Sequence, residues 1–287
     1  MTITSSSIAN TLLPFTLKND YLFRVIMQKC EDIRLEFLST FLDIPITDIK
    51  SAEITNPIKL GDSIDDKTYI LDVNVTLNNE SSIVTELQIV NEHNWPERSL
   101  GYLCREFDNL NRGDDYINLK PAILISILDF TLFIDNPKFH SIYCLSDTEN
   151  HYIYTSKFSI HVLDLTQINQ ASEGQEKLVF WAKMFNATTQ EEFDMLATEN
   201  QLASTMSDAM KKFYEQKNIA DQCRAREDYY NRKRAIEELI NKQSSTITNL
   251  KTQNSAQADT ITSLKTQNSK QANRIAELEA LLADKNK

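Results

Sequence analysis

The chain has 287 residues, of which 41% are hydrophobic, enough to build a sizeable core. Its formal net charge is −11, from 30 Lys and Arg against 41 Asp and Glu, so the totals do not indicate a basic nucleic-acid-binding protein. Only 4 glycines are present and they are scattered, which excludes a phosphate-binding P-loop, a dinucleotide-binding fingerprint and the nucleotide cofactors that these bind.

The cysteine pattern and the hydropathy favour a cytoplasmic protein. The 4 cysteines lie far apart without a CxxC pair, so we expect free thiols in a reducing compartment rather than disulfides or a zinc site. No stretch approaches ~18 consecutive apolar residues, which excludes a membrane span. The first residues lack the basic and apolar regions of a signal peptide, and we expect none.

Apolar residues recur at helical spacing between residues 22 and 41. A polar turn at residues 29–32 predicts two helices rather than one. Asn19 and Asp20 are both candidates for the N-cap of the first helix. A short strand is predicted at residues 51–57.

The next segment predicts a β-hairpin, because two runs rich in Val, Ile, Thr and Tyr flank the polar cluster at residues 78–81. A loop of two or four residues would oppose Asp72 to Leu87, whereas a three-residue loop or a bulge would oppose Asp72 to Glu86. Opposed Cβ atoms lie about 5 Å apart, and two carboxylates at that distance repel unless a divalent cation lies between them. The hairpin therefore carries either a metal site or a polar strand face exposed to water.

Past the hairpin, Pro96 predicts the start of a helix that runs to about residue 112. The almost wholly apolar run at residues 121–130 predicts a strand covered on both faces. A second hairpin is predicted within residues 140–154, and a further strand at residues 157–165. Strands interleaved with helices predict an α/β or α+β core with a central mixed sheet flanked by helices.

The C-terminal part predicts a coiled coil. Related sequences start at Ile247, Ile261 and Ile275, a period of 14 residues or two heptads. Ile at a positions with Leu at d positions favours a parallel dimer, and Asn at the intervening a positions sets the register and oligomer state. We expect a homodimer through this helix. A solvated single helix or a partly disordered tail is the alternative.

These patterns divide the chain into four parts. We expect a flexible N-terminus at residues 1–14, a core domain at residues 15–170, a helical extension at residues 171–205 and a long helix with the coiled coil at residues 206–287. The last boundary rests on the absence of Pro and Gly after residue 203.

The spacing Asp72, then Glu86-x-Gln88, resembles the PD-(D/E)XK nuclease superfamily. Within it, the chain is most similar to the recombination-promoting nuclease (Rpn) and transposase-like branch, in which Gln commonly replaces the last Lys of the motif. Four further stretches agree with that branch in the same order: NDYLF at 19–23, ERSLGYLCREF at 97–107, GDDYINLKPAILISILD at 113–129 and FSIHVLDL at 158–165. The resemblance covers about residues 15–200. It implies a restriction-endonuclease-like fold and a DNA endonuclease with a role in recombination or mobile DNA.

The resemblance also implies a set of site residues. Asp72, Glu86 and the Leu87 carbonyl would supply oxygen ligands of the kind that Mg²⁺ or Mn²⁺ takes. Gln88 stands at the position of the family's Lys and would hold the attacking water by hydrogen bonds, but an amide carries no charge and takes no proton. In related nucleases an acid on the first helix joins the metal shell. Asp20 is the candidate here, with capping of the helix as the alternative.

The Gln in place of Lys leaves a second interpretation open. A nuclease-derived fold that has lost its activity would serve as a binding or assembly module through the coiled coil. Acidic residues far outnumber basic ones between Gly61 and Asp115, so that region does not hold a long duplex by charge alone.

Two groups of residues are candidates for contacts with the DNA backbone. Arg98 and Tyr102 lie one turn apart on the helix after the hairpin. The other group is a set of basic residues interleaved with tyrosines in a helical stretch: Lys211, Lys212, Arg224, Arg226, Arg232, Lys233 and Arg234. An ordinary solvated helix surface is the alternative for both groups.

Overall fold

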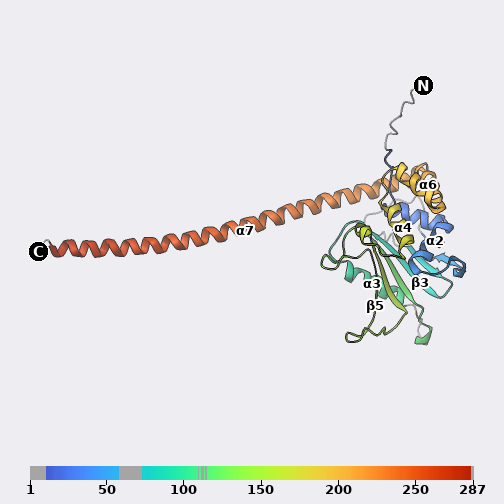
Figure 1. Cartoon of the computed structure of the whole chain (residues 1–287), viewed down its shortest axis with the longest axis horizontal. Coiled ribbons are helices and arrows are strands. Elements are labelled where there is room, and N and C mark those ends of the chain that lie inside the picture. The colour runs from blue at the N-terminus through green and yellow to red at the C-terminus, as the bar shows by residue number, and fades with distance from the viewer. Residues whose placement is uncertain (1–10, 58–72, 109, 111–112, 114, 286–287) are drawn as a thin grey trace, which may run out of the picture. The chain divides into compact units, whose positions relative to one another are not determined.

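A computed structural model describes residues 11–57, 73–108, 110, 113 and 115–285. The chain forms two compact units, Met1–Asn231 and Arg232–Lys287. The first holds the sheet, helices α1 to α6 and the start of α7 (Figure 1). In the part of the chain that the structure describes, no helix has both the length and the apolar composition needed to cross a membrane.

The centre of the first unit is a six-stranded mixed sheet with the strand order β1-β2-β3-β4-β6-β5. The strands are β1 (Ala52–Ile54), β2 (Val73–Leu77), β3 (Ser81–Gln88), β4 (Ala122–Leu128), β5 (His140–Cys144) and β6 (Phe158–Asp164). Strands β3, β4 and β6 are parallel, and the other pairs are antiparallel. The carboxyl ends of three neighbouring strands therefore lie at one edge of the sheet, where ligands of open α/β sheets commonly bind.

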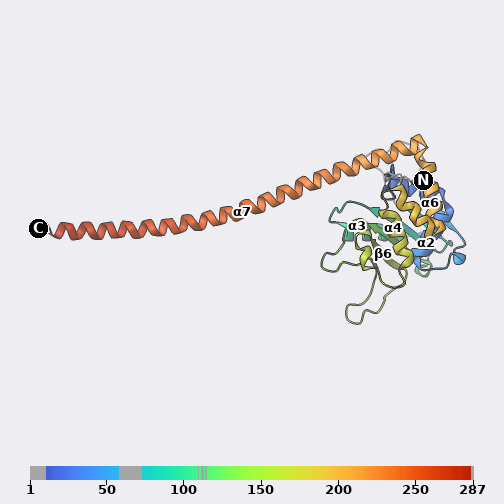
Figure 2. The ribbon, with the colours of Figure 1, turned by 45° about the horizontal axis from the view of Figure 1, so that its top comes forward.

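Helices cover both faces of the sheet, with α2 and α6 on one side and α3 on the other (Figures 1 and 2). The helices of the first unit are α1 (Asp20–Lys29), α2 (Glu31–Leu42), α3 (Trp95–Phe107), α4 (Glu176–Asn186), α5 (Gln190–Glu199) and α6 (Gln201–Tyr214), followed by the start of α7 (Lys217–Lys285). Three short 3₁₀ helices connect them: η1 (Ile46–Asp48), η2 (Tyr116–Asn118) and η3 (Leu165–Gln170). This is the restriction-endonuclease-like α/β core expected from the sequence.

The two faces of β3 contribute to two separate cores, because successive side chains of a strand point to opposite sides. Ile83 and Leu87 belong to the larger core, under α1, α2 and α4 to α6. Aromatic contacts between Phe37 and Trp181, with ring centroids 5.2 Å apart, lie in that core. Val84 belongs to the smaller core, under α3.

The hairpin forms as predicted, with the three-residue loop Asn78-Asn79-Glu80 between β2 and β3. Asn78 and Asn79 have φ of 53° and 59°, left-handed values that Asn tolerates better than most residues. Val73 faces Thr85 and Val75 faces Ile83, which is the register expected from a three-residue loop. Asp72 lies outside the described residues, so its pairing with Glu86 remains a prediction.

The two N-terminal helices are also confirmed, with Cys30 between them. The N-cap of α1 is Asn19, whose Oδ1 accepts a hydrogen bond from the Leu22 amide at 3.1 Å. Asp20, the other candidate, is the first residue of the helix and does not serve as the cap.

Three predicted elements differ from the structure. Helix α3 ends at Phe107 instead of near residue 112. Strand β5 pairs with β6, and the arms of the expected second hairpin meet beyond β5, at the bridge between Ser146 and Ile153. The Asp147 carboxylate also accepts a hydrogen bond from the Tyr152 amide there. The long C-terminal helix is interrupted at residues 215–216, because α6 and the first turns of α7 both bury apolar side chains in the larger core.

The core of the first unit includes residues from both sides of the domain boundaries expected at residues 170 and 205. Phe193, Met206 and Ile219 are buried in the same core as Tyr21 from α1. The compact unit ends at Asn231, within α7. The domain with the sheet is therefore built from elements of almost the whole chain before that residue.

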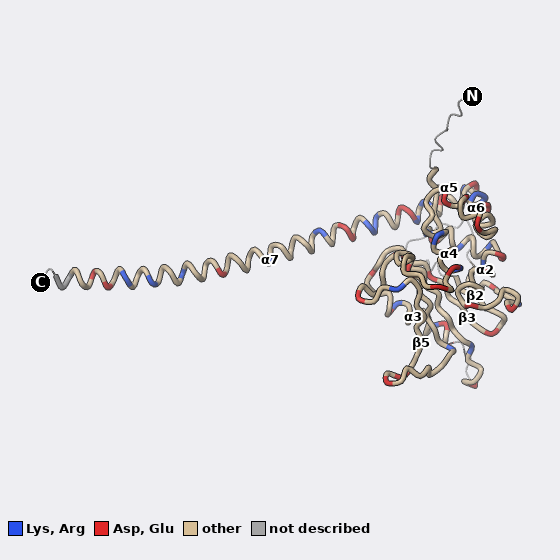
Figure 3. The backbone as a smooth tube through the Cα atoms, in the orientation of Figure 1, with Lys and Arg blue, Asp and Glu red and all other residues tan. Residues whose placement is uncertain are grey.

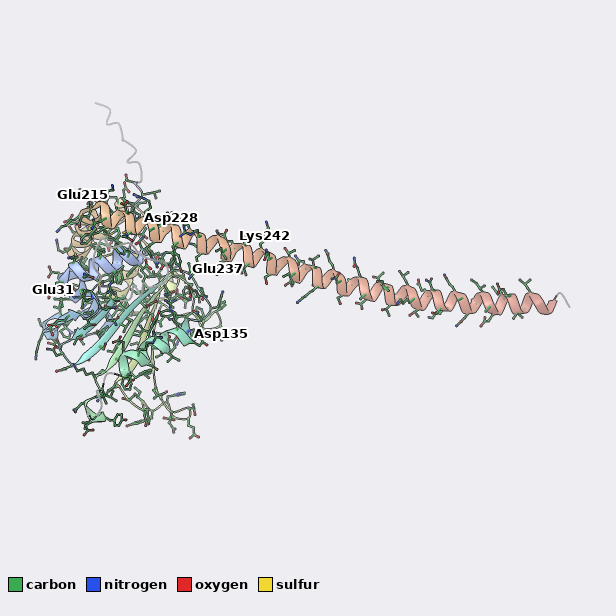
Figure 4. The ribbon with its side chains drawn as sticks, turned by 180° about the vertical axis from the view of Figure 1, so that it is seen from behind. Glu31, Asp135, Glu215, Asp228, Glu237 and Lys242 are labelled. Carbon is green, nitrogen blue, oxygen red and sulfur yellow. The ribbon has the colours of Figure 1, made fainter. Side chains whose placement is uncertain are left out.

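The second unit is the remainder of α7, a helix of 69 residues in all. The Ile and Leu residues at the a and d positions are about half exposed in the single chain: Ile247 53%, Leu250 52%, Ile261 53% and Leu264 52%. Side chains project above and below this helix beyond Lys242 in the view of Figure 4.

Candidate functional site

Glu86 and Gln88 lie near the carboxyl end of β3 and point to the same face of the sheet. Glu86 Oε1 accepts hydrogen bonds from Gln88 Nε2 at 2.6 Å and from Arg98 Nη2 at 2.9 Å. Glu86 is only 5% exposed. A buried carboxylate is unfavourable without a charged partner, and Arg98 supplies that charge from α3.

Arg98 is held by several groups at once. Its Nε donates to the Tyr102 hydroxyl at 3.0 Å, and its Nη1 lies 3.5 Å from Glu92 Oε2. Burial lowers the pKa of the Arg98 guanidinium and the Glu86 carboxylate raises it, with a net rise above the ordinary value. The guanidinium therefore stays charged and fixed beside Glu86.

The hydrogen bonds of β3 also determine toward which neighbouring strand the Leu87 carbonyl points. Gln88 O accepts from the Asp129 amide at 2.9 Å, and the Ser82 amide donates to Pro121 O at 2.8 Å, so these even-numbered residues of β3 bond toward β4. Backbone groups of alternate residues point to opposite sides of a strand, and the Leu87 carbonyl therefore faces the β2 side.

Two further acids, neither of them predicted from the sequence, lie at the carboxyl ends of the parallel strands. Asp129 follows β4 and bonds to Lys18 Nζ at 2.7 Å. Asp164 ends β6, is 2% exposed and accepts from the Thr166 amide and hydroxyl at 2.9 and 2.6 Å. Burial raises the pKa of the Asp164 carboxyl. Each Asp directly follows a run of apolar strand residues, which is the signal that could have found them.

Asp20 lies in a separate cluster with residues of α7. Its Oδ1 accepts from the Tyr21 amide at 2.8 Å and from Arg226 Nε at 2.9 Å. Its Oδ2 accepts from Arg226 Nη2 and from the Tyr230 hydroxyl. We call Asn19, Asp20, Arg226 and Tyr230 the α1–α7 clasp, since Asn19 Nδ2 also bonds to α7, at the Cys223 carbonyl (2.9 Å).

The structure thus brings together Glu86, Gln88, Arg98 and Tyr102 of the predicted site residues. Arg226 is engaged in the buried pair with Asp20. Among the described residues, no three His, Cys, Asp or Glu side chains gather as a metal site, and Asp72 is not among those residues. Glu86 and the Leu87 carbonyl are oxygen donors of the type that hard divalent cations take, so the donor set fits such an ion as far as it is described.

The remaining predicted DNA-contacting residues lie on the helices α6 and α7. The exposed ones in the first unit are Lys211, Lys212 and Arg224. The second unit carries Arg232, Lys233 and Arg234. Basic and acidic residues alternate in short segments along the backbone of the first unit (Figure 3).

A family model described as PD-(D/E)XK nuclease family transposase matches residues 17–242. The chain belongs to this family. No curated protein and no solved structure matches it. Membership supports a nuclease or transposase-like function, and PD-(D/E)XK nucleases generally use divalent metals. The matched segment of this PD-(D/E)XK chain includes the α1–α7 clasp, since it ends beyond Tyr230.

Proposed function

We propose that the chain is a metal-dependent DNA endonuclease of the Rpn and transposase-like kind, which hydrolyses phosphodiester bonds. The observation that carries this proposal is the buried Glu86 carboxylate, bonded to Gln88 and Arg98 beside the carboxyl edge of the parallel strands, in a chain of a nuclease family. The proposed role in recombination or mobile DNA rests on the family resemblance alone.

Asp72, Glu86 and the Leu87 carbonyl would hold the metal, with Mg²⁺ as the first choice and Mn²⁺ as a substitute. A bound ion at this place supplies a positive charge for the reacting phosphate and a water of lowered pKa. Gln88 bonds to the Glu86 carboxylate through its amide, and it would hold the attacking water by hydrogen bonds.

Arg98 would provide the positive charge that Gln88 lacks. A lysine at position 88 would present an ammonium to the phosphate, whereas here a guanidinium reaches the same carboxylate from α3. Arginine remains charged at all relevant pH values and binds phosphate oxygens well. The Tyr102 hydroxyl accepts a hydrogen bond from the guanidinium, and the centroid of the Tyr102 ring lies 5.4 Å from Arg98 Cζ.

The proposed partners are DNA and a second copy of the chain, in the cytoplasm. Contacts with the DNA backbone would come from Lys211, Lys212, Arg224, Arg232, Lys233 and Arg234. A parallel coiled coil through the repeats would pair two nuclease domains, so that each cuts one strand of a duplex.

A plasmid-nicking assay with Mg²⁺ and with EDTA tests the catalytic proposal. We expect Asp72→Ala and Glu86→Ala to lose more than the 10–100-fold in rate that typically follows loss of an outer-shell partner. Glu80→Ala, in the exposed loop of the same hairpin, is the matched control and should retain wild-type activity. Equal activity of the wild type and both site variants would contradict the assignment.

The second candidate is an inactive nuclease fold that acts as an assembly module, and Gln88 in the Lys position favours it. Calorimetric titration with Mg²⁺ and Mn²⁺ separates the two candidates. The endonuclease should bind metal in a manner that depends on Glu86, whereas a degenerate site should not.

A further inference from the structure

The Asp20 carboxylate has no acceptor capacity left over. An ionised carboxylate offers about four lone-pair positions on its two oxygens. Four donors occupy them: the Tyr21 amide, Arg226 through two nitrogens, and the Tyr230 hydroxyl. Asp20 is 4% exposed, so water does not compete for these positions.

The donors from α7 are themselves held firmly. The Arg226 guanidinium lies over the rings of Tyr229 and Tyr230, at 4.8 and 5.0 Å from their centroids. Its Nη2 donates to the Tyr230 hydroxyl at 3.0 Å. Tyr230 is 7% exposed. The turn of α7 that carries these residues is marked by Asp228 (Figure 4).

Coordination of a cation by Asp20 would have to break this arrangement. The divalent ion would displace Arg226, and the guanidinium would remain buried, without its carboxylate and next to a like charge. Breaking a buried pair in that way is strongly destabilising. Bonding to Arg226 and Tyr230 is therefore more favourable for Asp20 than coordination of a metal ion.

We propose that Asp20 is the anchor of α7 rather than a metal ligand, and that Arg226 and Tyr230 are the residues of α7 that it holds. The inference rests on the proposed endonuclease function, since it concerns which residues would hold the metal. Two independent facts agree with it: the compact first unit extends to Asn231, and the family match extends to residue 242. The start of α7 is then an integral part of the nuclease domain.

The metal-binding test uses the full-length chain with Mn²⁺ as the probe. We expect Asp20→Asn and Tyr230→Phe to bind Mn²⁺ like the wild type in calorimetry. Tyr230→Phe removes one hydroxyl and keeps the ring, so it guards against a simple folding defect. Asp221→Asn, at an exposed acid of α7, is the control and should also bind Mn²⁺ like the wild type. Weaker Mn²⁺ binding in Asp20→Asn alone would overturn the proposal, because it would make Asp20 a ligand.

A second measurement is independent of activity. In urea unfolding, Asp20→Asn and Arg226→Gln should each destabilise the protein, and the double variant should lose little more than the worse single variant, because both remove one interaction. Fully additive losses would overturn the anchor. Absence of Mn²⁺ binding and cleavage in the wild type would instead count against the endonuclease, and the unfolding cycle would still decide the clasp.

Discussion

At the scale of single residues, two histidines in the first unit stand out for their buried ring nitrogens. His140 Nε2 and His161 Nδ1 have no hydrogen-bond partner among the described residues. Their ring centroids lie 6.1 Å apart, on β5 and β6. Burial lowers the pKa of both imidazoles, and for His161 burial together with the neighbouring His140 lowers the pKa from its ordinary value of 6.5 to about 4.

The stability of the protein should therefore fall as the pH drops from 6.5 to 4. In that window His161 takes up a proton in the unfolded chain but not in the folded one, so the free energy of unfolding decreases by up to about 3 kcal/mol. Urea unfolding at a series of pH values measures this slope. His161→Leu should flatten it, while His151→Gln, at an exposed position, should leave it unchanged. A slope that persists in His161→Leu would show that other groups cause it.

At the scale of elements, the loop of the β2–β3 hairpin does more than reverse the chain. Asn78 Oδ1 accepts from the amides of Lys50 and Ser51 at 2.7 and 3.1 Å. Its Nδ2 donates to the Asp48 carbonyl at 3.0 Å. One side chain thus attaches the segment before β1 to the loop, and it helps to place β1 beside β2.

Substitution of this asparagine separates the two roles of the loop. Asn78→Gly keeps the left-handed backbone accessible but removes all three bonds, so we expect a loss of about 1–3 kcal/mol in the free energy of unfolding. Asn79→Gly has the same backbone requirement without comparable side-chain bonds, and should change stability by about 1 kcal/mol or less. Chemical denaturation of both variants makes the comparison. Equal effects would mean that the side chain of Asn78 contributes nothing.

At the scale of the whole molecule, the two units are stabilised in different ways. The first is held by cores on both faces of the sheet. The second is a helix whose Ile and Leu stripe is about half exposed in the single chain, and a helix of that kind is stabilised by packing against a partner rather than by itself.

Deletion of residues 236–287 should convert a dimer to a monomer in light scattering, and it leaves the α1–α7 clasp in place. The paired replacement of Ile247 and Ile261 by Gln should do the same in the full-length chain, because it places polar groups at a positions. Thr248→Gln with Thr262→Gln, one residue further along the helix, is the matched control and should remain dimeric. An unchanged mass after the deletion would contradict this interface.

Much of the fold follows from local patterns. The pair of helices α1 and α2, the hairpin and the buried strand β4 were predictable, because helical spacing, turn composition and apolar runs act over a few neighbouring residues. The register of the hairpin stayed open between two alternatives until the structure showed Val73 opposite Thr85. The pairing of β5 with β6 was not predictable in this way, because the register of a distant strand depends on which side chains the core accepts.

For the candidate site, too, some features were predictable from the sequence and others were not. The sequence by itself determined Glu86 and Gln88, two residues apart on one strand face, and the family to which they point. Only the tertiary structure decided their partners: Arg98 from α3, and the clasp that joins Asp20 to Arg226, 206 residues later. The identity of a charged residue does not determine whether it binds a metal, a phosphate or another side chain. That choice depends on which groups the packing of the core brings within hydrogen-bonding distance, and at what cost in desolvation.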